Sequence, residues 1–152
     1  MFYDKKKDLY KEVSELTVEV ETRVRFNETD ALGIVWHGNY LVYFEDAREA
    51  FGRKYGISYL DMLQAGYVTP IVASSCAHKL TLKYGDVIRI QATYVASPAA
   101  KIIFRFKILN DQDQVVCTGE TTQVFLDQAN NLSLAIPPFY EEWKAKLGLT
   151  EA

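Results

Sequence analysis

A helical stripe in the first half of the sequence limits the folds that this chain can adopt. Large apolar side chains recur at steps of three and four residues between 39 and 55, which places them on one face of an α-helix. The stripe consists of Tyr40, Phe44, Ala47, Phe51 and Tyr55. Gly56 follows as a typical helix end. A helix with one broad apolar face must bury it against a second layer, so the rest of the chain has to supply that layer.

The rest of the sequence predicts an antiparallel sheet as that layer. Apolar and charged residues alternate between 18 and 26, which is typical of a half-buried strand. A short helical segment is expected at 59–65. Turn sequences then separate further strand-like segments at 69–84, 87–96, 102–108 and 115–126. Pro137 and Pro138 open a C-terminal helix that runs to Leu147. We therefore predict an α+β fold, in which a five-stranded antiparallel sheet wraps around one long central helix.

Composition and charge are those of one ordinary globular domain. Residues 1–16 are predicted to form an N-terminal arm or short helix, and residues 17–152 the folded domain with its C-terminal helix. A net charge of -3 without a basic stripe argues against a nucleic-acid partner. The apolar runs are too short to cross a bilayer, and no secretory signal is recognisable. We expect a cytoplasmic protein without a membrane partner.

Metal and cofactor chemistry find no support in the sequence. The two histidines, His37 and His78, are far apart, and Cys76 and Cys117 lack the spacing of a ligand set or a disulfide framework. There is also no glycine-rich phosphate loop. We expect no metal, no cofactor and two reduced thiols.

The segment 27–40 carries the chemistry. It reads Asn-Glu-Thr-Asp-Ala-Leu-Gly-Ile-Val-Trp-His-Gly-Asn-Tyr and links the first strand to the long helix. A helix start offers unpaired backbone N–H groups and partial positive charge, which can hold a developing oxyanion. Asp30 in that loop can attack a carbonyl carbon or activate water beside it. This arrangement is typical of an acyl-transfer site that works without a serine triad.

The same segment, with Phe-Glu-Asp-Ala-Arg at 44–48, resembles the hotdog-fold acyl-CoA thioesterases. The closest resemblance is to the branch of 4-hydroxybenzoyl-CoA thioesterase and the Tol–Pal-associated thioesterases, and it extends over residues 17–138. It implies that Asp30 is the catalytic carboxylate and that the N–H groups around His37, Gly38 and Asn39 form the oxyanion site. It also implies hydrolysis of an acyl-CoA, with coenzyme A entering only as part of the substrate.

The resemblance further implies an assembly. A homodimer with a continuous sheet is expected, paired again into a dimer of dimers, with active sites at the dimer interface. Ser74 and Ser75 of the neighbouring subunit are then candidate lining residues, and Tyr40 and Phe44 are candidates for lining the acyl group.

Several alternatives stay open at this stage. Asp30 could merely cap the loop or the helix, because aspartate is common at such positions. His37 could contribute its side chain or only its backbone. A hotdog dehydratase or isomerase of acyl thioesters would share the same cradle, and so would a non-catalytic acyl-CoA binding protein. The sequence leaves open the acyl group, the choice between coenzyme A and an acyl carrier protein, and the choice between nucleophile and general base for Asp30.

Overall fold

Antiparallel pairing joins all the strands into one sheet in the computed structural model, which describes residues 11–149. The strands are β1 (Lys11–Arg23), β2 (Ile71–His78), β3 (Val87–Ala96), β4 (Lys101–Leu109) and β5 (Val115–Val124). Their order across the sheet is β1-β3-β4-β5-β2, and every neighbouring pair is antiparallel. The outermost strands are therefore β1 and β2, which lie far apart in space although both flank the long helix in sequence.

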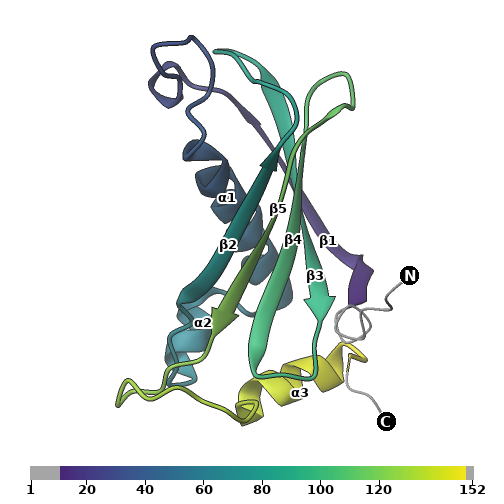
Figure 1. The fold of residues 1–152 in the computed structure, drawn as a ribbon. Coiled ribbons are helices and arrows are strands. Elements are labelled where there is room, and N and C mark those ends of the chain that lie inside the picture. Colours follow the sequence, from purple (N-terminus) through teal and green to yellow (C-terminus); the bar gives the residue numbers. More distant parts are fainter. Residues whose placement is uncertain (1–10, 150–152) are drawn as a thin grey trace, which may run out of the picture.

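The helices lie on one face and at one end of this sheet. They are the 3-10 helix η2 (Phe26–Glu28), α1 (Asn39–Tyr55), α2 (Tyr59–Gln64) and α3 (Pro138–Lys146). Figure 1 shows α1 running along the sheet, with α2 and α3 at the lower end and the loop that precedes α1 at the upper end. The predicted α+β class, with five antiparallel strands and one long helix, is confirmed.

Helix α1 has the boundaries that its apolar stripe predicts. Gly56 ends it in the left-handed conformation, with a φ of 77° and an N–H group that donates to the carbonyl of Gly52. Tyr40, Phe44 and Phe51 are buried as expected, whereas Tyr55 is only half-buried. The additional buried aromatic is Tyr43, which widens the stripe toward the loop before the helix.

Aromatic side chains of α1 pack against the middle strands of the sheet, and the ring of Phe51 lies edge-on to that of Phe104 in β4 at a centroid distance of 4.8 Å. The ring of Phe44 stacks on that of Phe106 in β4, with a centroid distance of 4.5 Å and an interplanar angle of 10°. Gly119 of β5 lies directly beneath the same ring, because a Cβ there would overlap Phe44. Most other contacts of α1 are with β1 and β3. Edge strand β2 is consequently exposed along almost its whole length.

The first strand begins earlier than the sequence predicts. β1 starts at Lys11, so the expected arm or short helix over residues 1–16 is wrong from residue 11 onward, and residues 1–10 lie outside the described residues. The physical reason is an irregularity in the pairing with β3. Glu12 pairs with Val95, but the regular ladder resumes only where Thr17 pairs with Thr93. Extra residues in one strand disrupt the two-residue alternation by which a strand is recognised.

The predicted strand over residues 69–84 is also shorter in the structure. β2 ends at His78, and the chain from 79 to 86 returns as a loop toward the segment before α1. The carbonyl of Leu82 accepts a hydrogen bond of 2.9 Å from the N–H of Val35. This loop therefore supports the candidate site instead of extending the sheet.

Gly119→Ala should lower the free energy of unfolding by about 1–3 kcal/mol, the usual cost of overpacking a core. The new Cβ would lie 2.5 Å from the carbonyl oxygen of Ser75 and would also overlap the ring of Phe44. Urea denaturation measures the change, with Thr118→Ala on the adjacent residue as control. Equal midpoints for the two variants would show that α1 and β2 both accommodate the added methyl group without a loss of stability.

Candidate functional site

Asp30 lies at the first position of a tight hairpin before α1. The N–H of Asp30 donates to the carbonyl of Ile34 at 2.9 Å, and its carbonyl accepts from the N–H of Gly33 at 2.9 Å. Gly33 has a φ of 77°, which suits glycine and closes the turn. Carboxylate atom Oδ1 accepts the N–H of Leu32 at 2.8 Å, while Oδ2 accepts no hydrogen bond within residues 11–149. Oδ1 thus stabilises the turn, and Oδ2 remains available to contact a ligand.

Hydrogen bonds to the backbone hold this hairpin against the body of the protein. Thr29 and Val35 form a bridge across its base, and Ile34 forms a second bridge with Lys83. The N–H of Trp36 donates to the carbonyl of Glu28 at 2.9 Å, and that carbonyl also accepts Nδ2 of Asn39 at 2.8 Å. The side chain of Asn39 therefore ties the hairpin to the first turn of α1.

Glu28 joins the loop to α1 through its side chain as well. Its Oε1 accepts a hydrogen bond of 3.1 Å from the hydroxyl of Tyr43 and one of 2.7 Å from the N–H of Arg25. Burial, together with the negative charge of Glu28, raises the pKa of Tyr43 well above its usual value. Tyr43 therefore stays a neutral donor to the glutamate at physiological pH. Glu28 therefore positions the hairpin through both its backbone carbonyl and its side-chain carboxylate.

The start of α1 presents backbone donors, as the sequence predicts, but not all three are available. The N–H of Asn39 donates to the carbonyl of Trp36 at 2.9 Å. The N–H groups of His37 and Gly38 donate to no group in the part of the chain that the structure describes. Gly38 is the N-cap residue, and a side chain there would overlap the ring of Trp36. The imidazole of His37 is exposed, with its centroid 5.1 Å from the ring of Trp36.

The two serines proposed from sequence face opposite sides of the sheet. Ser74 pairs with Thr121, which is buried on the side of α1, and Ser75 pairs with Glu120. Glu120 forms an ion pair with Arg105 on the outer face. Because successive side chains of a strand alternate between faces, both hydroxyls cannot line one pocket. Only Ser74 faces the side covered by the helix, and the lining of a neighbouring subunit's site by Ser74 and Ser75 stays a prediction.

Tyr40 and Phe44 are core residues within one protomer. Tyr40 is 3% exposed and Phe44 1% exposed, and both lie between α1 and the sheet. Tyr40 packs edge-on against His78, at a centroid distance of 4.9 Å. Burial raises the pKa of Tyr40, so its hydroxyl is also neutral at physiological pH. Their role in lining a substrate stays a prediction.

Neither cysteine is suited to act as a nucleophile. Cys76 and Cys117 are free thiols on adjacent strands, half-buried and buried respectively. Burial raises the pKa of the Cys117 thiol to about 12 and also raises that of Cys76. The reactive species is the thiolate, so both groups are unreactive near neutral pH.

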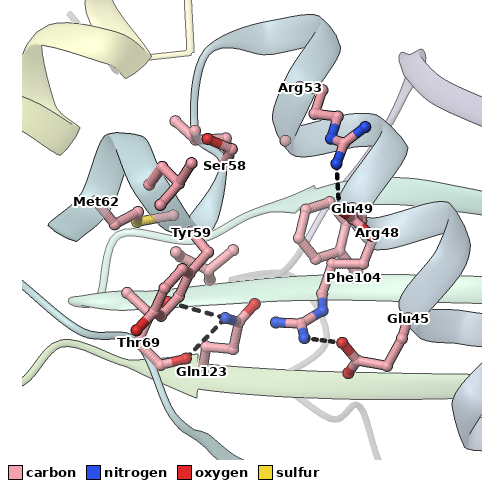
Figure 2. A pocket seen from close by; sticks show the side chains of 14 residues that line it. Glu45, Arg48, Glu49, Arg53, Ser58, Tyr59, Met62, Thr69, Phe104 and Gln123 are labelled. Carbon is pink, nitrogen blue, oxygen red and sulfur yellow. Dashed lines mark hydrogen bonds and ion pairs between the residues drawn. The ribbon is translucent and has the colours of Figure 1, made fainter. Parts of the chain in front are cut away.

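A cavity of about 650 Å³ lies between α1, α2 and the inner face of β4 and β5. Its floor is apolar and includes Ile102, Phe104 and Met62. Its rim is polar, and Figure 2 shows the Glu45–Arg48 and Glu49–Arg53 ion pairs of α1 along one wall. None of the site residues predicted from sequence lines this cavity.

The cavity lies along the middle and later turns of α1, whereas the Asp30 hairpin precedes the first turn of that helix. Thr69, just before β2, and Gln123, at the end of β5, place the cavity near α2, at the lower end of Figure 1. The hairpin lies at the upper end, before the first turn of α1. The sequence gives one signal for the cavity. Polar Thr121 and Gln123 occupy inward positions of β5, where apolar residues are usual.

Tyr43→Phe should reduce the free energy of unfolding by about 1–2 kcal/mol, because it removes a hydrogen bond to a charged acceptor. It should also speed amide hydrogen exchange at Leu32 and Gly33, since Glu28 positions their hairpin. Tyr55→Phe is the matched control, because the hydroxyl of Tyr55 makes no hydrogen bond within residues 11–149. Unchanged exchange rates at Leu32 and Gly33 in Tyr43→Phe would show that the Tyr43–Glu28 hydrogen bond does not stabilise the hairpin.

Two structural features have no counterpart within residues 11–149. No group of three or more His, Cys, Asp or Glu side chains is arranged to hold a metal ion. No helix in the same range is both long and apolar enough to cross a membrane.

Comparison with known proteins places the chain in a family. Residues 24–146 match the model of the Thioesterase-like superfamily. An inferred esterase of Aquifex aeolicus is 44% identical over 113 residues, which cover 74% of this chain and 87% of that protein. Acyl-CoA thioester hydrolase YbgC of Escherichia coli is 26% identical over 121 residues, which cover 76% and 86%. Among solved structures, a 4-hydroxybenzoyl-CoA thioesterase in complex with 4-hydroxybenzoyl-CoA superposes with a TM-score of 0.72 at 23% identity, over 84% of this chain and 97% of that one.

The match covers the hairpin, α1 and every strand of the sheet except β1. The superposition on the solved thioesterase structure agrees with the fold described above. The chain belongs to the Thioesterase-like superfamily.

Proposed function

We propose that this protein hydrolyses acyl-CoA thioesters, with Asp30 as the reacting carboxylate. The observation that carries the proposal is the junction between the hairpin and α1. There a half-buried carboxylate with one unpaired oxygen is fixed in the hairpin that leads into α1, and the His37 and Gly38 N–H groups at the start of that helix are unpaired. Membership of the superfamily and the thioester hydrolase activity of the E. coli relative support the reaction.

The chemistry requires little more than these groups. The N–H groups of His37 and Gly38 stabilise the oxyanion that forms when the thioester carbonyl is attacked. Asp30 either attacks the carbonyl carbon, giving a mixed anhydride that water then hydrolyses, or removes a proton from the attacking water. In both routes the C–S bond breaks, and coenzyme A leaves as the thiol with the carboxylic acid as the other product.

A homodimer formed through β2 would bring the Asp30 hairpin of one protomer close to the cavity of the other. β2 is an exposed edge strand, and such an edge pairs readily with its own copy around a two-fold axis. An axis perpendicular to the sheet at this edge makes the two β2 strands antiparallel and turns the partner end for end. The partner's hairpin then comes to the end of the sheet where this chain's cavity lies. In this arrangement the acyl group occupies the cavity of one protomer while Asp30 of the other reacts.

The finer assignments belong to the same proposal. We place the chain in the branch of 4-hydroxybenzoyl-CoA thioesterase and the Tol–Pal-associated enzymes, because of its Asp-Ala-Leu-Gly segment at 30–33 and its His-Gly-Asn-Tyr segment at 37–40. A dimer of dimers and a cytoplasmic location remain predictions of that assignment.

Asp30→Asn should lower kcat by about 10²- to 10⁴-fold, the usual contribution of a general base, with little change in KM. Asparagine keeps an oxygen that can accept the N–H of Leu32, so the hairpin should survive the change. Release of free thiol from a panel of short-chain, long-chain and aromatic acyl-CoAs measures the effect.

Asp127→Asn is the matched control, since Oδ1 of Asp127 likewise accepts backbone N–H groups, those of Ala129 and Asn131, in an exposed turn. Equal turnover in wild type and Asp30→Asn would remove Asp30 from the mechanism. Tight binding of acyl-CoA without turnover in wild type would point to a binding protein or to a dehydratase.

Mixing two inactive variants tests whether the site is shared between protomers. Glu49→Trp should block the cavity, because Glu49 lines it from an exposed position on α1. If Asp30 acts on the partner's cavity, equal amounts of Asp30→Asn and Glu49→Trp protein, exchanged into mixed dimers, should recover about a quarter of wild-type activity by random pairing. Activity confined to the sum of the two separate variants would place the hairpin and cavity of one protomer in the same site.

A further inference from the structure

A second hollow, of about 470 Å³, lies at the end of β1 beside the Asp30 hairpin. We call it the Phe26 hollow. The carbonyl of Phe26 accepts the N–H of Thr29 at 3.1 Å, and Ile34 forms a bridge with Lys83, the residue before Tyr84. A ligand held here would therefore lie next to the reacting loop. The lining residues are Thr22, Arg23, Val24, Arg25, Phe26 and Tyr84.

Two exposed aromatic rings form a corner of the Phe26 hollow. Phe26 is 75% exposed and Tyr84 66% exposed, and their rings meet edge to face at a centroid distance of 5.8 Å and an interplanar angle of 87°. A flat ring can stack on the face of one of them while it contacts the edge of the other. Such a ligand would also remove apolar surface from water, which stabilises the complex. The corner therefore suits a planar aromatic ligand.

The same hollow is positively charged. Arg23 and Arg25 are both exposed, and no lining residue is acidic. Nη1 of Arg23 donates to the carbonyl of Gly85 at 2.9 Å, which holds its guanidinium between β1 and the loop after β2. Arg25 forms no ion pair within residues 11–149, although its backbone N–H donates to Oε1 of Glu28 at 2.7 Å. Guanidinium groups bind phosphates through paired N–H donors, so the charge of the hollow matches a ligand with phosphate groups.

A planar ring joined to phosphate groups is the chemistry of a nucleotide. Coenzyme A ends in one, with adenine, a ribose phosphate and a diphosphate, whereas an acyl carrier protein presents the pantetheine arm without adenine. The reach agrees as well. Phe26 precedes Asp30 by four residues, which span at most about 14 Å. The pantetheine arm has roughly as many chain atoms as four residues, so one molecule can extend from the hairpin to the hollow.

We propose that the Phe26 hollow binds the nucleotide end of coenzyme A, with adenine against Phe26 and Tyr84 and the phosphates on Arg23 and Arg25. The proposal rests on the thioesterase function proposed above and adds the carrier, which is free coenzyme A and not an acyl carrier protein. The nucleotide is then bound by the chain that supplies Asp30, while the acyl group enters the partner's cavity.

The test compares one acyl group on two carriers. Thioesters of coenzyme A and of pantetheine share the acyl group, the thioester and the arm, and differ at the nucleotide end. Wild type should hydrolyse the coenzyme A thioester with a kcat/KM at least about tenfold higher, mainly through a lower KM, because stacking and phosphate contacts act on binding and not on the breaking bond.

Binding without turnover gives an independent measurement. In isothermal titration calorimetry, free coenzyme A should bind wild type with a Kd at least about tenfold lower than that of pantetheine. Added salt should narrow the difference, because screening weakens contacts between exposed charges.

Phe26→Ala and Arg25→Gln should each reduce the preference for coenzyme A by about three- to tenfold. Both side chains are exposed, so their loss should cost little stability. Lys107→Gln is the control for lost positive charge, since Lys107 is exposed on β4 and does not line the hollow, and it should keep the wild-type preference. A general disturbance of the hairpin would lower hydrolysis of both thioesters equally, so the ratio separates recognition from stability.

The outcomes distinguish this inference from the function on which it rests. Equal Kd values for coenzyme A and pantetheine in wild type overturn the nucleotide site alone, and so does a preference that persists in both variants. Faster hydrolysis of an acyl carrier protein thioester than of the coenzyme A thioester overturns the choice of carrier. Hydrolysis of no thioester in the wider panel overturns the thioesterase proposal, while the binding measurement still decides whether the Phe26 hollow holds a nucleotide.

Discussion

The structure depends on a mismatch between one helix and a wider sheet. Five strands spaced by about 4.8 Å make a sheet close to 20 Å across, whereas a helix with its side chains is about 10 Å thick. Helix α1 therefore covers mainly β1 and β3; it reaches β4 through Phe44 and Phe51, and β5 through Phe44. The inner face near β5 is left with a cavity, and β2 with an unpaired edge. Both features that the proposed function uses, the space and the edge, follow from this incomplete cover.

The junction at Glu28 has the opposite character, because almost every polar group there is satisfied. Its carbonyl accepts two donors and its carboxylate two more, from the loop and from α1. Such a joint fixes the hairpin without any contribution from Asp30 beyond one carboxylate oxygen. A thioester needs little more than a well-placed carboxylate and two N–H donors, since a thiolate is a good leaving group. Rigidity in the loop therefore substitutes for a larger set of catalytic side chains.

Local patterns predicted the parts of the fold that local forces decide. The stripe on α1 and the turn glycines are short-range signals, and the helix begins and ends where they indicate. The start of β1 was missed because extra residues opposite β3 hide its alternation. The faces of Ser74 and Ser75 required the register with β5, which is a long-range property. Asp30 and the helix start could be selected by residue type, but the N–H of Asn39 proved to be occupied by the turn before it.

The division between hairpin and cavity explains why the motif indicates a reaction but not a substrate. Residues 27–40 contain the carboxylate and the helix start, all within one continuous segment that can be recognised in the sequence. The cavity is lined by residues from α1, α2, β4 and β5, so it cannot be recognised from any short segment of the sequence. Even the contacts within its lining join distant segments, since Nε2 of Gln123 in β5 donates to the carbonyl of Thr69 before β2. Under the proposed function, acyl specificity can change through single inward-facing residues of β4 and β5 while the Asp30 loop remains intact, because the cavity and the hairpin are built from different segments of the chain.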